Sequence, residues 1–203
     1  MTSFLIRPAT LEKKDDELLV DFMDSHIAWL CEIGSAEQWG TEPVREARPG
    51  VGKQSQKWIE RSESENQWGL EWCRAFVAGA ETALGNAEST HSIPVCALVL
   101  EGKSPEYVRS TLPEQDEKDS FAYLAYLMSN RKAGMLGKGA GSALITFAKD
   151  KVREAGVSRI CLDCFAGNDG KLVKYYESQG FNVITEFGTG DQNWPCAVLE
   201  MRL

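Results

Sequence analysis

Leu136-Gly137-Lys138-Gly139-Ala140-Gly141-Ser142-Ala143-Leu144 is the most informative stretch of this sequence. It joins an apolar, aromatic run at 121–129, which predicts a buried strand, to a segment at 142–155 whose apolar residues recur at helical spacing. Glycines at such a junction let the backbone approach a ligand, and the free N–H groups at a helix N-terminus attract phosphate oxygens. The stretch therefore predicts a phosphate-binding turn.

Two other phosphate-binding motifs do not fit this stretch. A P-loop needs a glycine, four residues and then Gly-Lys-Ser/Thr, but with Gly137 and Lys138 in place, position 132 is lysine and position 139 is glycine. The dinucleotide fingerprint would require a glycine at Ser142. That fingerprint also belongs in the first strand–helix unit of a Rossmann domain, whereas this stretch lies about two-thirds of the way along the chain.

The rest of the chain predicts a mixed α/β domain with strand–helix–strand units in its C-terminal half. Glycines and prolines at 35–57 predict an irregular segment, and the acidic stretch 103–120 predicts a solvated loop. The predicted helices are 11–33, 53–65, 142–155 and 171–179, and the predicted strands are 4–8, 71–79, 93–101, 121–129, 159–165, 181–187 and 196–203.

The glycine stretch resembles motif A of the GNAT superfamily of N-acetyltransferases, which places Gln/Arg-x-x-Gly-x-Gly/Ala at a strand–helix junction. Downstream, Asn168, Tyr176 and Gly180-Phe181 resemble the family's Asn…Tyr-x-x-x-Gly-Phe segment, and residues 4–10 are similar to its opening strand. The resemblance implies an α/β fold of the α+β type. Its mixed central sheet would have about six to seven strands flanked by helices, with splayed parallel strands holding acetyl-CoA.

The resemblance also implies that residues 1–203 form one acetyltransferase domain, in which different segments bind the substrate and the cofactor. Residues 1–120 would form mainly the substrate side, 121–187 the acetyl-CoA-binding core and 188–203 a closing strand. By the same resemblance, main-chain contacts with acetyl-CoA are assigned to Leu127, Met128 and Ser129. The residues that would bind the pyrophosphate or otherwise contact the coenzyme are Leu136, Gly137, Lys138, Gly139, Ala140, Gly141, Ser142 and Asn168.

Leu136 departs from the family pattern, because it stands where the family has Gln or Arg. Only its backbone N–H can serve the phosphates, which leaves Lys138, Arg131 or Lys132 as candidates for the missing charge. The side chain of Leu127 is expected to pack in the core rather than to contact the cofactor.

Acetyl transfer to an amine requires a general acid for the leaving thiolate and a general base for the amine. By the resemblance Tyr176 is the acid, because it keeps the family's spacing to Gly180-Phe181; Tyr175 is the alternative, since the segment from Asn168 is one residue longer than is usual. The base stays open, because 121–128 contains no carboxylate. The candidates for the base are Glu81, Glu101, Asp119 and His26, while Tyr123 and Tyr126 could line the site.

Composition limits the partners. A net charge of −8 and a pI near 4.9 argue against a nucleic-acid-binding protein and suit a cationic substrate. Because the sequence contains two histidines, we do not expect a histidine-rich metal site. The six cysteines, including Cys161 and Cys164, are expected to be reduced core residues. With no signal-peptide pattern and no apolar run long enough for a membrane span, a cytoplasmic enzyme is expected.

The resulting prediction is an acyltransferase that moves the acetyl group of acetyl-CoA directly to a primary amine, most favourably of a small molecule, with no metal. Five of the six tryptophans lie in the N-terminal half, where an aromatic pocket would suit an amine, although packing is their commoner role. Two alternatives stay open: a protein lysine or N-terminus as acceptor, and a non-catalytic CoA-binding module. The oligomeric state also stays open, with a homodimer as one alternative.

Overall fold

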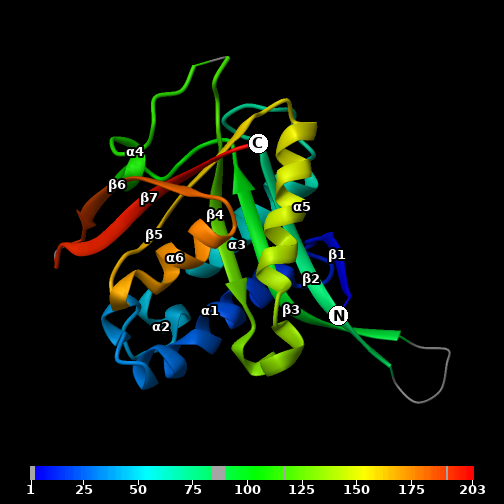
Figure 1. Cartoon of the computed structure of the whole chain (residues 1–203). Coiled ribbons are helices and arrows are strands. Elements are labelled where there is room, and N and C mark those ends of the chain that lie inside the picture. Colours follow the sequence, from blue (N-terminus) through cyan, green and yellow to red (C-terminus); the bar gives the residue numbers. More distant parts are fainter. Residues whose placement is uncertain (1–2, 84–89, 117, 191) are drawn as a thin grey trace. The chain divides into compact units, whose positions relative to one another are not determined.

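The computed structural model describes residues 3–83, 90–116, 118–190 and 192–203. Its strands form one mixed sheet in the order β1-β2-β3-β4-β5-β7-β6 (Figure 1). Their bounds are β1 Phe4–Pro8, β2 Cys73–Ala83, β3 Thr90–Glu101, β4 Ala122–Ser129, β5 Arg159–Phe165, β6 Asn182–Thr189 and β7 Trp194–Arg202. The predicted mixed sheet is confirmed.

Helices and turns connect the strands in the predicted alternation. The α-helices are α1 Asp15–Glu32, α2 Val44–Ala47, α3 Val51–Glu63, α4 Glu106–Arg109, α5 Ala140–Glu154 and α6 Lys171–Ser178. The described residues also contain the 3₁₀ turns η1 Ala36–Gln38, η2 Arg131–Gly137 and η3 Asn168–Gly170.

Strand directions follow from the connections. β1 and β2 are antiparallel, as are β5 with β7 and β6 with β7. β4 and β5 are parallel, with Ala122 opposite Ile160 and Tyr123 opposite Cys161. Parallel neighbours require a crossover connection, and α5 lies in the chain between β4 and β5.

The chain forms two compact units. The first comprises Met1–Asn66, Cys73–Val99 and Tyr126–Thr146, and the second comprises Gln67–Trp72, Leu100–Ala125 and Phe147–Leu203. The boundaries between the two units fall inside β3, β4 and α5 and on either side of residues 67–72. The prediction of one domain over 1–203 stays a prediction.

In the first unit, α1 buries one face against α3 and the sheet. The phenol of Tyr126, on β4, donates a 2.8 Å hydrogen bond to the carbonyl of Leu19 and packs edge-on against Trp58 of α3. Tyr126 is therefore a core residue rather than a lining residue of an open site. The buried hydrophobic side chains of α1 are Leu19, Val20, Phe22, Met23, Ile27 and Leu30.

Two segments predicted as irregular contain short helices, which is a correction. α2 and the start of α3 fall within 35–57, and α4 falls within 103–120. The cause of α2 is tertiary: the carboxylate of Asp24 on α1 accepts the Val44 N–H at 2.6 Å and the Arg45 Nε at 2.6 Å. A cap supplied from another helix leaves no local sequence signal.

The cysteines are free: Cys31 is exposed, and Cys73, Cys96, Cys161, Cys164 and Cys196 are buried. The expected core role of Cys161 and Cys164 is confirmed. Among the residues described, no helix is long and apolar enough to cross a bilayer.

A buried arginine organises the second unit. Arg159, at the start of β5, is 2% exposed, and its Nη1 lies 3.0 Å from Oε1 of Glu200 on β7. Its Nε lies 3.1 Å from Oδ1 of Asp119, and its Nη2 donates to the carbonyls of Glu114 and Asp119. One side chain thus fixes β5, β7 and the segment that leads into β4.

Replacing Arg159 with Met should destabilise the protein by about 3–5 kcal/mol, because the largely buried Glu200 loses its nearer basic partner and the carbonyls of Glu114 and Asp119 lose a donor. Urea unfolding measures the difference. The matched control is Arg153→Met, which removes an exposed arginine from α5 and should change stability by less than about 0.5 kcal/mol. Equal effects of the two substitutions would contradict the assignment.

Candidate functional site

The glycine-rich turn presents unused N–H groups. η2 ends at Gly137, and Gly139 has φ +89°, a left-handed value that favours glycine. α5 then begins, with the Ala143 N–H bonded to the Gly139 carbonyl at 3.0 Å. Within the described part of the chain, no acceptor faces the N–H groups of Gly139, Ala140, Gly141 and Ser142. The first turn of α5 therefore leaves N–H groups available to an anion, and the predicted binding of phosphate there stays a prediction.

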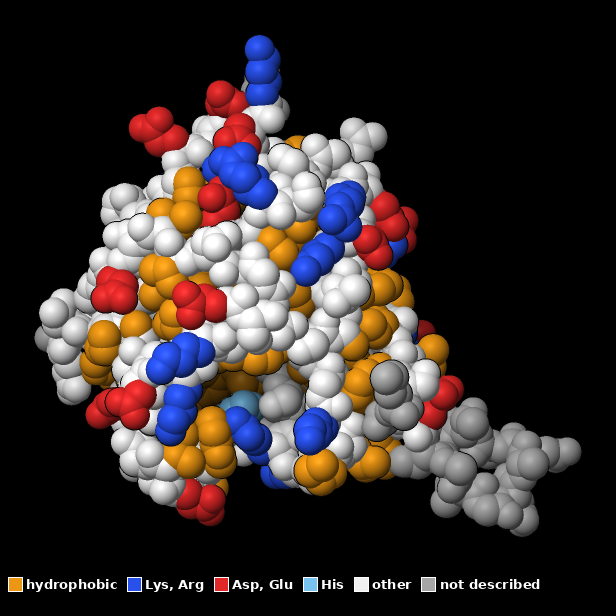
Figure 2. Space-filling view, viewed as in Figure 1, with side chains coloured by type: hydrophobic (Ala, Val, Ile, Leu, Met, Phe, Trp, Pro, Cys, Tyr) orange, Lys and Arg blue, Asp and Glu red, His pale blue; other side chains and the backbone are white. Residues whose placement is uncertain are grey.

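The side chains around this turn are exposed. Leu136 is 38% exposed and Met135 75%, and Lys132 and Lys138 are exposed too. Figure 2 shows basic and hydrophobic side chains next to each other over η2. Lys132 and Lys138 are therefore accessible, and the prediction that one of them supplies the charge that Leu136 lacks stays open. Arg131 is less suited, because its guanidinium lies 3.4 Å from the centroid of the Trp29 ring.

The end of β4 is held by the first unit's own groups. Nε2 of His26 on α1 lies 2.8 Å from the Ser129 carbonyl, and the Asn130 N–H donates to the Val95 carbonyl at 2.8 Å. Of the main-chain groups of Ser129, which are predicted to contact the cofactor, the carbonyl thus already accepts a hydrogen bond. Leu127 and Met128 are half-buried, and their predicted main-chain contacts stay predictions.

His26 is a poor candidate for the general base. Burial, more than the nearby Arg131 charge, lowers its pKa to about 4, although the bond to Ser129 opposes this shift. At neutral pH the ring is therefore uncharged, with Nε2 donating to the carbonyl. The ring also packs against Trp29 and Trp39, at centroid distances of 5.8 and 6.2 Å.

The tryptophans divide between core and surface. Trp58 and Trp72 are buried, which matches the packing role. Trp29 and Trp39 are half-buried, but Arg131 already lies over Trp29 and Arg48 lies 5.8 Å from the centroid of Trp39. One face of each ring is therefore taken by an arginine, which weakens the prediction that these rings receive an amine.

In the second unit, Asn168 and Tyr176 lie where β5 passes into α6. Asn168 is half-buried in η3 with φ +53°, and its Oδ1 accepts a 3.3 Å hydrogen bond from Lys171. Tyr176 is 7% exposed and packs against Tyr175 and Phe181, with ring centroids 5.3 and 5.7 Å apart. Tyr175 is the more exposed of the two tyrosines.

The second unit also holds a carboxylate that sequence reasoning missed. Asp163, in the middle of β5, accepts hydrogen bonds from Tyr107 of α4 at 3.0 Å and from Tyr123 of β4. Burial raises the pKa of Asp163, while these two phenols oppose the rise. Among the described residues, no basic side chain pairs with it. The available signal was an acidic residue, Asp163, within the otherwise apolar run from Ile160 to Phe165.

The carboxylates considered from sequence are less suitable than Asp163. Asp119 is bound to Arg159 and lies 3.3 Å from Nη1 of Arg202. Glu101 is 6% exposed at the end of β3, and Glu81 is exposed on β2. A metal site finds no support in the described segments, where no three His, Cys, Asp or Glu side chains gather to hold an ion.

Comparison with known proteins identifies part of the chain. The sequence model of the acetyltransferase (GNAT) family matches residues 107–181. This segment contains Tyr107, Asp163 and Tyr176 together with the glycine-rich turn. Among curated proteins, no sequence matches the chain.

Solved structures share the fold over nearly their whole length. A ribosomal-protein-alanine N-acetyltransferase from Brucella melitensis has 17% identity and a TM-score of 0.60, covering 98% of this chain and 99% of its own. A GNAT-family acetyltransferase from Listeria monocytogenes has 22% identity and a TM-score of 0.58, with 98% and 95% covered. The yncA protein of Salmonella typhimurium, solved with acetyl-CoA, has 13% identity and a TM-score of 0.59, with 98% and 94% covered.

The buried His26 should make stability depend on pH. Because its pKa is about 4 in the folded protein and about 6.5 when unfolded, the unfolded chain binds more protons between these values. Stability should therefore fall as pH drops from about 6.5 to 4, by up to about 3 kcal/mol. Urea unfolding at several pH values measures this.

His26→Asn is the matched variant, because an amide can still donate to the Ser129 carbonyl but does not titrate. Its stability should fall less steeply over the same pH range. Parallel pH profiles of the two proteins would refute the assignment of this loss to His26.

Proposed function

Residues 107–181 carry the sequence signature of the GNAT acetyltransferase family on a fold shared with GNAT enzymes, and from this premise we propose that the protein transfers the acetyl group of acetyl-CoA to the primary amine of a small molecule. The observation that supports this most is the row of unused N–H groups from Gly139 to Ser142 at the start of α5. Such a row binds phosphate oxygens without needing a positively charged surface.

Acetyl-CoA would be held through its pyrophosphate by this cradle. Gly137, Gly139 and Gly141 leave the approach free of side chains, and Lys138 or Lys132 would add positive charge. Leu127, Met128 and Asn168 keep their proposed contacts with the rest of the coenzyme. When bound, the coenzyme supplies a thioester whose carbonyl carbon an amine can attack.

Asp163 is the proposed general base. A carboxylate whose pKa is raised by burial is a better proton acceptor near neutral pH than an exposed one. The incoming ammonium would give its proton to Asp163, and the freed amine nitrogen would form the new C–N bond. Tyr107 and Tyr123 orient the carboxylate through their hydroxyl groups.

Tyr176 is the proposed general acid. As the C–S bond breaks, its hydroxyl would give a proton to the departing thiolate. The second proton that the nitrogen loses as the amide forms would restore the phenol, and the proton taken by Asp163 would pass to solvent. Its packing against Tyr175 and Phe181 restricts the ring to few orientations. Tyr175 remains the alternative.

The acceptor is proposed to be a small amine because Asp163 and its two phenols can recognise an ammonium group and offer no contact specific to a peptide. The net charge of −8 would also favour the approach of a cation. The proposed cytoplasmic location and a homodimer rest on the sequence alone.

Incubation with acetyl-CoA and a panel of amines tests the function, with CoA release as the readout. Polyamines, amino acids and aminoglycosides represent small acceptors, and lysine-containing and free N-terminal peptides represent proteins. Turnover with a small amine is expected. Turnover with peptides alone would favour a protein acceptor, and acetyl-CoA binding without turnover would favour a binding module.

Gly139→Glu should weaken acetyl-CoA binding by at least about tenfold, because a carboxylate at the cradle repels the pyrophosphate. Isothermal titration calorimetry measures the affinity. Gly139→Gln is the matched control, since it has nearly the same shape and the same backbone strain at φ +89° without the charge. If the Gly139→Glu and Gly139→Gln variants bind acetyl-CoA with equal affinity, the pyrophosphate does not lie at Gly139.

Tyr176→Phe should lower kcat about 10²-fold or more while acetyl-CoA affinity stays within about twofold, because only the proton is lost. Steady-state kinetics with the best amine of the panel measure both. Tyr175→Phe is the paired variant. A larger loss from Tyr175→Phe would move the acid role to that residue.

Asp163→Asn should lower kcat/KM for the amine about 10²–10⁴-fold and remove the acidic limb of its pH profile. Tyr107→Phe should keep activity but move this limb to higher pH, because the lost hydrogen bond had lowered the pKa of Asp163. Asp150→Asn, an exposed change on α5, is the control. An unchanged limb in Asp163→Asn would exclude Asp163 as the base.

A further inference from the structure

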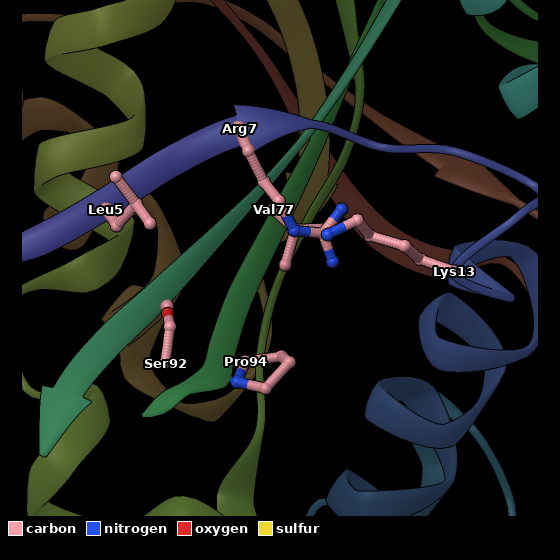
Figure 3. A pocket seen from close by; sticks show the side chains of 7 residues that line it. Leu5, Arg7, Lys13, Val77, Ser92 and Pro94 are labelled. Atoms are coloured by element: carbon pink, nitrogen blue, oxygen red, sulfur yellow. The ribbon is translucent and has the colours of Figure 1, made fainter. Parts of the chain in front are cut away.

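The first unit contains a pocket on the surface of β1, β2 and β3, with a volume of about 290 Å³ (Figure 3). At about 30 Å³ per water in the liquid, this equals roughly ten water molecules. Neither the proposed cofactor cradle nor the proposed acid and base contributes to it. Its lining residues are Leu5, Arg7, Lys13, Val77, Gly79, Ser92 and Pro94.

A glycine keeps the pocket open to a hydroxyl group. Leu5 pairs with Gly79 and Arg7 with Val77 across β1 and β2, so these residues share one face of the sheet. A Cβ atom at Gly79 would lie 1.9 Å from Oγ of Ser92. The Ser92 hydroxyl therefore occupies the space of the missing side chain, and any larger residue at 79 would displace it.

The charges at the pocket do not cancel. Arg7 forms a bidentate pair with the buried Asp15, at 2.6 and 2.9 Å, and Asp15 also accepts the Thr10 N–H at 2.7 Å. Both oxygens of this carboxylate thus already accept hydrogen bonds. Figure 3 shows the side chain of Lys13 pointing toward the Arg7 guanidinium. Within the described ranges, no acidic group pairs with the Lys13 ammonium.

The hydrogen-bond donors of the pocket that have no partner indicate which kind of ligand would fit. The Lys13 ammonium and the Ser92 hydroxyl can both donate, and neither has a hydrogen-bond acceptor among the side chains and backbone described. Leu5, Val77 and Pro94 offer apolar walls beside them. One uncompensated positive charge next to an apolar surface fits one negative charge attached to a hydrocarbon group.

We propose that this pocket binds a monovalent organic anion, namely a short aliphatic carboxylate. Its carboxylate accepts from Lys13 and Ser92 and relieves the repulsion between Lys13 and Arg7. Its alkyl chain covers Leu5, Val77 and Pro94. Because Lys13 lies between β1 and α1, the bound anion also ties this connection to the sheet.

Titration of the uniformly ¹⁵N-labelled full chain with sodium butyrate, followed by amide NMR, tests the proposal. Saturable shifts at Leu5, Val77, Gly79 and Ser92 are expected, with a Kd of about 1 mM, a small-ligand value. Sodium chloride at equal ionic strength should give no saturable shift. Butyrate shifts that do not saturate, or that chloride reproduces, would overturn the proposal.

Variants separate the contacts. Lys13→Met should weaken butyrate binding at least about tenfold and Ser92→Ala several-fold, whereas Lys57→Met, an exposed change on α3, should leave it unchanged. Both pocket positions carry exposed side chains, and the amide spectrum itself reports whether each variant is folded. An unchanged Kd in Lys13→Met, or inorganic phosphate binding as tightly as butyrate, would refute the proposed ligand class.

Discussion

The buried guanidinium of Arg159 is the interaction on which the second unit depends. A charge this far from water is tolerated only when it is paired and its hydrogen-bonding groups are used. Arg159 is paired with Glu200 and Asp119, and its two Nη atoms donate to Glu200 and to the carbonyls of Glu114 and Asp119, whereas its Nε contacts Asp119 without a hydrogen bond. These contacts fix the start of β5. The same strand carries Asp163 and leads through Asn168 into α6, so the position of the proposed base and acid follows from this anchor.

In a protein this acidic, the proposed binding of a highly anionic coenzyme requires local rather than global attraction. The net charge of −8 opposes acetyl-CoA at long range. The N–H groups at the start of α5 provide an attraction that does not depend on surface charge. Asp163 has the complementary surroundings: a carboxylate in contact with two phenols and with no basic partner described. The two sites therefore suit ligands of opposite charge.

Patterns that act within a few residues were predictable from sequence. The turn around Gly139, the helix after it and the segment from Asn168 to Phe181 were all found at their places, because glycine conformation and helical periodicity are local. The helix α2 and the role of Asp163 were missed. The first is capped by Asp24 of another helix, and the second acquires its pKa from burial and from Tyr107, distant in the chain.

The sequence by itself determined the alternation of strands and helices, the glycine turn and the resemblance to acetyltransferases. The tertiary structure alone decided which side chains remain available for chemistry. It placed Arg131 over Trp29, engaged Asp119 with Arg159 and buried Tyr126 against α1, which removed each from the candidates. The reason is physical: backbone conformation follows mainly from neighbouring residues, whereas burial and pairing follow from residues that only folding brings together.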